Sequence, residues 1–172
     1  MPDLTIRPCD AQRRPLVRLR VPLVEAARAA VALRLPTDPM RWSGSDPAAL
    51  WIGPDQWLLV GERLSSEEII SACGTQLADI LHAATDSSDA LTCFMLEGSS
   101  ARMLLAMVSG IDFHPELVGP AHCVRTRIAK LAVVVRALGD ERFEIFVDRS
   151  ASRYFHEYLR RNAHDPILRK GR

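Results

Sequence analysis

The feature that most constrains this chain is one order of predicted strands and helices that occurs twice along its 172 residues. The first cycle has four predicted elements: an alternating strand at 16–21, an alanine-rich helix at 24–33, a hairpin at 50–60 and an amphipathic helix after Ser65. The second cycle repeats this order with one additional strand: a strand at 91–96, a helix at 101–108, the additional strand at 124–128, a hairpin at 131–147 and a last helix after Ser150. A repeated order of elements indicates a doubled supersecondary unit. We therefore predict an α+β fold of two repeated βαββα-type units, with antiparallel sheets packed against helices.

The two cycles are predicted to share one domain. The segment between them, around Asp86, is short, and each cycle is small for a core of its own. We expect a single α+β domain over residues 15–163, with pseudo-repeats at 15–83 and 89–163. Residues 1–14 are predicted to be a flexible N-terminal segment, and residues 164–172 a flexible tail.

Serines mark the predicted starts of three helices. Ser65 with Glu68 three residues later has the spacing of a capping box. Ser99 or Ser100 is expected to cap the helix at 101–108, and Ser150 the last one. The apolar positions of the first of these helices are Ile69, Cys73, Leu77, Ile80 and Leu81. Those of the last helix are Ala151, Tyr154, Phe155 and Tyr158.

Composition excludes some classes of protein. Hydrophobic residues make up 48% of the chain, too many for a disordered one, and 22 basic against 21 acidic side chains give a net charge of +1. This balance predicts no nucleic-acid partner, because duplex-binding domains are strongly basic. We also expect no membrane association, since the chain has no apolar run of about 18 residues and no secretory signal at its start. A cytoplasmic location follows as an expectation.

The cysteines and histidines give no catalytic pattern. The thiols at 9, 73, 93 and 123 contain no C-x-x-C pair, and reduced, buried cysteines are the simplest interpretation. His122 and Cys123 are neighbours in a predicted strand, where successive side chains point to opposite faces. His82 and His156 are expected on helix surfaces, and His114 in a loop as a turn-stabilising residue.

Motifs for a serine nucleophile and for nucleotide or cofactor binding are missing from the sequence as well. It contains no G-x-S-x-G, G-x-x-x-x-G-K-[ST] or G-x-G-x-x-G segment. Residues 98–101 join a strand to a helix, where backbone N–H groups could bind an anion, although ordinary helix capping explains them better. We therefore predict no catalytic, cofactor-binding or metal-binding residue in this chain.

Trp51 and Trp57 are the candidate interface residues. They flank the turn of the hairpin at 50–60, where large aromatic side chains serve either as cross-strand core or as anchors of a protein interface. Both roles remain open at this stage. The arginine pairs of the second half are interspersed with acids and indicate a solvated surface, or else the rim of an interface.

Three ordered segments of the chain resemble signature segments of one known family. Residues 50–59 (LWIGPDQWLL) resemble its "LWLGPDEWLL" signature, and residues 123–130 (CVRTRIAK) its "C-x-R-T-x-x-A-K" segment. Residues 143–154 (FEIFVDRSASRY) are similar to its C-terminal "FELLVPRSFARYL" stretch. On these segments the chain resembles the gamma subunit of heterotetrameric sarcosine oxidase, and the resemblance covers the chain from about residue 16 to residue 159.

The resemblance also implies a fold. That family is related to the folate-binding aminomethyltransferase, the T protein of glycine cleavage, and residues 94–101 (FMLEGSSA) look like its strand-to-helix joint. The doubled βαββα layout of its folate-binding domain is therefore implied here. The chain departs from the T protein in two respects. Its paired-aspartate segment is represented at most by Asp55, and 172 residues leave no room for its C-terminal barrel.

The function implied by the resemblance is that of a non-catalytic structural subunit. The complex of that family oxidatively demethylates sarcosine to glycine, with tetrahydrofolate as one-carbon acceptor. Flavins, NAD, zinc and tetrahydrofolate belong to the partner subunits by resemblance, and no cofactor is expected on this chain. The implied partners are alpha, beta and delta subunits, chiefly alpha. The alternatives are a stand-alone folate-binding or one-carbon-metabolism protein, and a globular domain without a partner.

Overall fold

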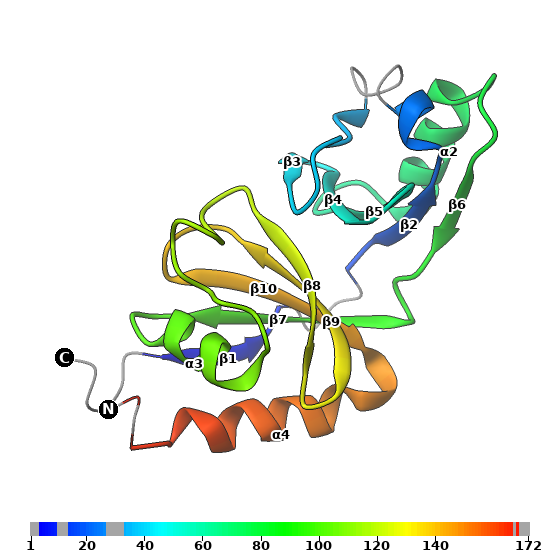
Figure 1. The fold of residues 1–172 in the computed structure, drawn as a ribbon. Helices are drawn as coiled ribbons and strands as arrows, with labels where there is room; N and C mark the ends of the chain where they lie inside the picture. The colour runs from blue at the N-terminus through cyan, green and yellow to red at the C-terminus, as the bar shows by residue number, and fades with distance from the viewer. Residues whose placement is uncertain (1–3, 10–13, 27–32, 167, 169–172) are drawn as a thin grey trace. The chain divides into compact units, whose positions relative to one another are not determined.

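The computed structural model describes residues 4–9, 14–26, 33–166 and 168. They group into two compact units (Figure 1). The contiguous unit consists of residues 12–91, and the composite unit combines residues 1–11 with residues 92–172. Each unit has a five-stranded sheet and its own helices, so the predicted α+β class is confirmed.

The contiguous unit has a sheet of order β3-β4-β5-β2-β6, in which every pair of neighbouring strands is antiparallel. In chain order its elements are β2 (Leu16–Arg20), β3 (Trp42–Gly44), β4 (Ala48–Gly53), β5 (Gln56–Val60), α2 (Ser66–Gln76) and β6 (Ala83–Asp86). Alternation along β2 sends Val17 and Leu19 to the face covered by α2, where they join Trp57, Leu59 and Ile69 in one core. This face of the sheet therefore provides the hydrophobic core of the contiguous unit.

Helix α2 begins as its sequence predicts. Ser65 accepts the Glu68 N–H at 3.2 Å, while the Glu68 carboxylate accepts the Ser65 N–H at 2.7 Å, which completes the capping box. The Ser65 backbone N–H, followed by its hydroxyl, lowers the pKa of Glu68 below its usual value. The predicted apolar face extends too far, however. The helix is capped by Leu77, and Leu81 lies beyond it with 89% of its surface exposed.

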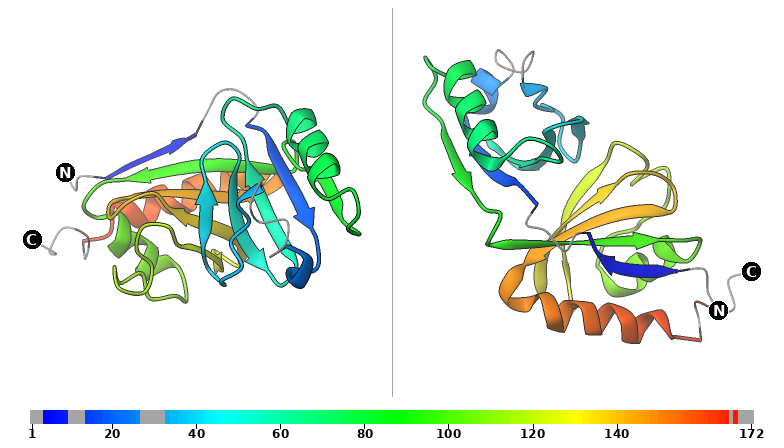
Figure 2. Two further views of the ribbon diagram at one scale, coloured as in Figure 1. Left: turned by 90° about the horizontal axis from the view of Figure 1, so that it is seen from above. Right: turned by 180° about the vertical axis from the view of Figure 1, so that it is seen from behind.

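The composite unit has a sheet of order β1-β7-β10-β9-β8. Its strands are β1 (Thr5–Pro8), β7 (Leu91–Glu97), β8 (Cys123–Ile128), β9 (Leu131–Ala137) and β10 (Arg142–Asp148), and its helices are α3 (Ala101–Val108), the 3₁₀ turn η1 (Arg149–Ala151) and α4 (Ser152–Ala163). Helix α4 runs alongside this sheet in both views of Figure 2. Leu104 of α3 and Phe155 of α4 share a core with Val135 and Ile145 of the sheet.

Several predicted details of the composite unit are wrong. Ser100 precedes α3 but makes no side-chain cap. Ser150 lies inside η1, where Asp148 is the capping residue and accepts the Ser150 N–H at 2.9 Å. On α4 the buried residues are Phe155 and Leu159, while Tyr154 is 55% exposed. The 3₁₀ turn delays the start of α4 from the predicted residue 151 to Ser152, and the buried face of the helix is centred on Phe155 and Leu159.

Three short strands are absent from the prediction. Strand β1 forms within the segment expected to be flexible, and β3 and β6 occupy an expected loop and linker. Of the helix predicted at 24–33, residues 24–26 and 33 are helical, and residues 27–32 lie outside the described residues. Leu168, in the predicted flexible tail, is 4% exposed and belongs to the core of the composite unit. Residues 167 and 169–172 of that tail also lie outside the described residues.

The contiguous unit ends at residue 91, and β1 joins the composite unit. The pseudo-repeats at 15–83 and 89–163 stay a prediction. A single domain over residues 15–163 stays a prediction.

Among the described residues, no helix combines the length and the apolar character that crossing a membrane requires.

Candidate functional site

The predicted hairpin with Trp51 and Trp57 forms β4 and β5 of the contiguous unit. The two tryptophans lie directly opposite each other in the antiparallel register. The strands are joined by a turn at Pro54 and Asp55, and Asp55 has a positive φ of 57°. The Asp55 carboxylate accepts the Leu23 N–H at 2.6 Å, and its carbonyl accepts the Val21 N–H at 3.1 Å. The turn is therefore attached to the chain that leaves β2.

Trp57 belongs to the core. Its side chain is 0% exposed, and its indole N–H donates to the Pro36 carbonyl at 2.9 Å. A buried tryptophan needs such a partner for its N–H, and this bond holds the loop before β3 against the sheet. Trp51 is half-buried and packs at the edge of the same core. An interface role for the pair stays a prediction, and the burial of Trp57 makes Trp51 the member that a partner could reach.

The other two segments of the family resemblance also lie at strands and turns. Residues 123–130 form β8 and the following turn, where Ala129 and Lys130 have φ values of 52° and 69°. Two successive positive φ values are those of a type I′ hairpin, which matches the twist of the flanking strands. Residues 143–154 form most of β10, all of η1 and the start of α4. These motifs therefore specify backbone geometry.

The histidines lie in separate environments. The ring nitrogen Nδ1 of His114 accepts the Glu116 backbone N–H at 3.4 Å, and the His114 backbone N–H donates to the Asp112 carboxylate at 2.8 Å. The predicted role of His114 in a turn is therefore confirmed. His82 lies between α2 and β6 rather than on a helix. His156 is on α4 but half-buried, with its ring 5.4 Å from that of Phe94. None of these contacts joins a histidine to a cysteine.

The cysteines differ from the expectation of reduced thiols. Cys9 and Cys93 form a disulfide that joins the segment after β1 to β7. They are 84 residues apart in the sequence, and the pairing depends on the register of the unpredicted strand β1, so no local signal reveals it. Cys73 and Cys123 are buried thiols, and burial raises the pKa of Cys73 to about 11. At neutral pH Cys73 is therefore a protonated core residue rather than a nucleophile.

One group of ligand-type atoms lies beside the disulfide. The sulfur atoms of Cys9 and Cys93 and a carboxylate oxygen of Glu144 lie within 4.8 Å of one another. The sulfurs are bonded to each other, so they offer thiolate ligands only after reduction. Glu144 is also held by Arg136, whose Nη1 donates to its Oε2 at 3.1 Å. This arrangement is that of a closed structural cluster, and the absence of a metal site stays a prediction.

Residues 98–101 join β7 to α3 as ordinary backbone. The Gly98 N–H donates to the Glu141 carbonyl at 2.9 Å, and the Gly98 carbonyl accepts the Ala101 N–H at 2.9 Å. Gly98 has a φ of 125°, a conformation that other residues adopt at a cost. The joint is therefore occupied by hydrogen bonds within the chain.

Comparisons with known proteins agree with this structural interpretation. Residues 21–165 match the model of the "Sarcosine oxidase, gamma subunit family". A sarcosine oxidase subunit gamma from Corynebacterium sp. (strain U-96) is 28% identical over 103 residues, which are 59% of this chain and 48% of that protein. One from Arthrobacter sp. is 26% identical over 96 residues, 55% of this chain and 45% of that protein. The chain therefore spans about half the length of the curated relatives it matches.

Two solved structures share the fold. A heterotetrameric sarcosine oxidase from Corynebacterium sp. U-96, in complex with pyrrole 2-carboxylate, matches with a TM-score of 0.82 and 23% identity, over 92% of this chain and 83% of that one. The glycine cleavage system aminomethyltransferase T from Bartonella henselae matches with a TM-score of 0.68 and 12% identity, over 96% of this chain and 46% of that one. The predicted likeness to the aminomethyltransferase fold is confirmed.

The resemblance carried by residues 50–59, 123–130 and 143–154 is confirmed by the family model, which spans all three segments. Because that model matches well over half of the sequence, the chain belongs to the sarcosine oxidase gamma subunit family.

Proposed function

We propose that this chain is a non-catalytic structural gamma subunit of a sarcosine oxidase-like heterotetrameric complex. The observation that carries the proposal is the family match over residues 21–165. The complex would oxidatively demethylate sarcosine to glycine, with tetrahydrofolate as the one-carbon acceptor. Its flavins, NAD, zinc and tetrahydrofolate would bind to partner subunits, and its location would be cytoplasmic.

The nature of the shared motifs supports a structural role. The family segments fall on the turn at Pro54 and Asp55, on the turn at Ala129 and Lys130, and on strand β10. These residues set the strand register and reverse the chain direction, and neither task requires a reactive side chain. Among the described residues, Cys9 and Cys93 form a disulfide, Cys73 and Cys123 are buried thiols, and His114 lies in a turn. The residues that distinguish this family thus determine the shape of the chain.

The alpha subunit would be the main partner, with beta and delta subunits completing the assembly. Trp51 is the proposed contact residue, because it is the half-buried member of the Trp51–Trp57 pair and tryptophan is enriched among the anchors of protein interfaces. Trp57 would support it as a fully buried neighbour on the adjacent strand.

Co-expression with the candidate alpha, beta and delta subunits tests the proposal. We expect native mass spectrometry to find one copy of each in a complex that oxidises sarcosine, while the purified chain alone leaves sarcosine unchanged. Trp51→Ala should weaken the association, whereas Tyr154→Ala, at an exposed aromatic residue of the composite unit, should leave it intact. Sarcosine demethylation by the chain alone would contradict the proposal.

Calorimetry separates this role from that of a stand-alone folate-binding protein. We expect no saturable heat when a reduced folate is titrated into the isolated chain. Saturable binding at low micromolar concentration, together with no association with the other subunits, would favour the stand-alone protein.

A further inference from the structure

A cavity of about 320 Å³ lies over one side of the contiguous unit's sheet, at strands β5 and β2 and the edge strand β6. Its polar lining includes Arg18 and Arg20 of β2, Gln56 of β5 and Thr85 of β6. Ile52 of β4 adds an apolar side chain. All the residues that line it belong to the contiguous unit.

Strand register explains why the two arginines meet there. Arg18 and Arg20 are two residues apart on β2, so their side chains leave the same face of the sheet, about 7 Å from each other along the strand. Arg20 lies opposite Gln56 on one neighbouring strand, and Arg18 lies opposite Thr85 on the other. The intervening Leu19 points to the other face and enters the core. Two guanidinium groups, an amide and a hydroxyl therefore converge on one side.

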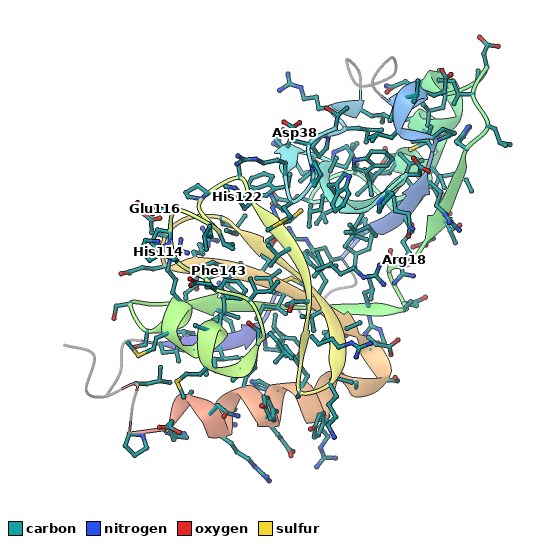
Figure 3. All side chains as sticks on the ribbon, in the orientation of Figure 1. Arg18, Asp38, His114, Glu116, His122 and Phe143 are labelled. Carbon is teal, nitrogen blue, oxygen red and sulfur yellow. A yellow bond between two sulfur atoms is a disulfide. The ribbon has the colours of Figure 1, made fainter. Side chains whose placement is uncertain are left out.

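The guanidinium groups lack acidic partners within the described part of the chain. No hydrogen bond or ion pair joins the side chain of Arg18 or Arg20 to another described residue, and both are exposed (Figure 3 labels Arg18). Asp86, next to Thr85 on β6, belongs by alternation to the opposite face, where its Oδ2 accepts the Ser66 hydroxyl at 2.9 Å. Two neighbouring positive charges without a counter-charge repel each other, and an anion between them removes that repulsion.

We propose that this cavity binds a carboxylate group carried on a short aliphatic stem. A guanidinium donates two parallel N–H bonds to a carboxylate, and two arginines on one face can hold a single carboxylate between them or two ends of a dicarboxylate. The amide of Gln56 and the hydroxyl of Thr85 are in place to donate further hydrogen bonds. Ile52 provides apolar contact for the stem, and the cavity volume exceeds what a small inorganic anion fills.

Such a group has two sources, a free dicarboxylic acid or a Glu or Asp side chain of a partner subunit. Carboxylate binding in this cavity does not depend on the proposed subunit role, and it can be tested with this chain alone. Only the partner source rests on that role.

The first arm titrates the full chain with succinate and follows the arginine Nε–H signals by NMR. We expect saturable shifts at Arg18 and Arg20, and an affinity at least about tenfold weaker in Arg18→Gln and Arg20→Gln, because each loses charge-assisted hydrogen bonds. Arg125→Gln is the matched control, since Arg125 is also an exposed strand arginine, on β8. The neutral succinamide should not bind. Both test positions are exposed, and dispersed amide spectra verify that the variants fold.

The second arm follows the same signals in the assembled complex. If Arg18 and Arg20 shift on assembly, succinate no longer binds, and their glutamine variants weaken assembly, then the carboxylate comes from a partner. If the complex still binds succinate, the source is a free acid. The proposal is overturned if neither arm perturbs Arg18 and Arg20, if Arg125→Gln has the same effect as the test variants, or if inorganic phosphate binds as tightly as succinate.

Discussion

Arg136 on β9 and Glu144 on β10 lie directly opposite each other and form a buried ion pair, with 3.1 Å between Nη1 and Oε2. Their side chains are 6% and 3% exposed. Removing one member of such a pair leaves the other as an uncompensated buried charge. We expect Glu144→Gln to lower the free energy of unfolding by about 3–5 kcal/mol in urea denaturation.

Two variants serve as controls for this pair. Arg142→Gln breaks the ion pair with Glu97, which is similarly short at 2.9 Å but exposed, and should cost at most about 1 kcal/mol. The double variant Arg136→Met/Glu144→Leu removes both charges and should recover much of the loss. If Glu144→Gln lowers the free energy of unfolding no more than Arg142→Gln does, this outcome would contradict the burial of the Arg136–Glu144 pair.

The sequence reveals those features whose causes are local. The capping box of Ser65 and Glu68 and the hairpin turn at Asp55 depend on residues only a few positions apart, and both are where the sequence predicts them. Positive φ at Ala129 and Lys130 carries no such signal, because neither residue type favours that conformation. The edge strands β1 and β3 were not predictable either, since four or three residues are too few to show a period.

The candidate sites illustrate the same limit. The Trp51–Trp57 pairing follows from the predicted hairpin, but the deeper burial of Trp57 depends on Pro36 and on α2, which are distant in sequence. Arg136 is one of the arginines that the sequence assigns to a solvated surface or an interface rim, but its side chain is buried. Strands β9 and β10 carry apolar residues on both faces, so alternation does not mark which face is buried. The cavity beside Arg18 requires the pairing of β2 with β6, and β6 was not predicted.

Arg102 of α3 holds the loop between α3 and β8. Its guanidinium donates to the carbonyls of Phe113, Val118 and Asp140, each at 2.7 Å, and lies 5.1 Å from the centre of the Phe143 ring. A lysine cannot reproduce three bonds from one planar group. We expect Arg102→Lys to cost about 1–3 kcal/mol, because loop carbonyls lose their donors, and to speed amide hydrogen exchange over residues 113–118.

The matched control for Arg102 is Arg127→Lys, at an exposed position on β8. It should change neither stability nor exchange in the loop. Unchanged exchange at residues 113–118 in Arg102→Lys would show that these residues are held by their own turn bonds instead.

Asp46 makes the contiguous unit sensitive to acid. Burial raises its pKa, but the N–H groups of Glu62, Arg63 and Leu64 outweigh this effect and lower the pKa below the usual 3.8. The bonds from Glu62 and Arg63 are both 2.9 Å long. A carboxyl whose pKa is lowered on folding stabilises the protein above its unfolded pKa, and this contribution is lost as the pH falls through the folded pKa.

Urea denaturation across pH tests this dependence. We expect Asp46→Asn to be less stable than the parent protein at neutral pH, and the difference to shrink below about pH 4 as the parent's carboxyl becomes protonated. Asp79→Asn, at an exposed carboxylate of the same unit, should show no such convergence. A difference between Asp46→Asn and the parent that stays constant down to about pH 2 would contradict the role of the charge.

The Cys9–Cys93 disulfide should stabilise the composite unit by attaching its first strand to β7. The Cys9 N–H also donates to the Cys93 carbonyl at 2.9 Å, so the bond closes a pairing that the backbone already makes. A cross-link between residues 84 positions apart restricts the unfolded chain strongly, and we expect reduction to cost about 2–4 kcal/mol.

Cys9→Ser should reproduce this loss and abolish the effect of a reductant on unfolding. Peptide mapping without reduction should recover residues 9 and 93 in one linked product, with Cys73 alkylated only after unfolding. If reductant leaves the unfolding midpoint of the parent protein unchanged, the disulfide does not contribute to its stability.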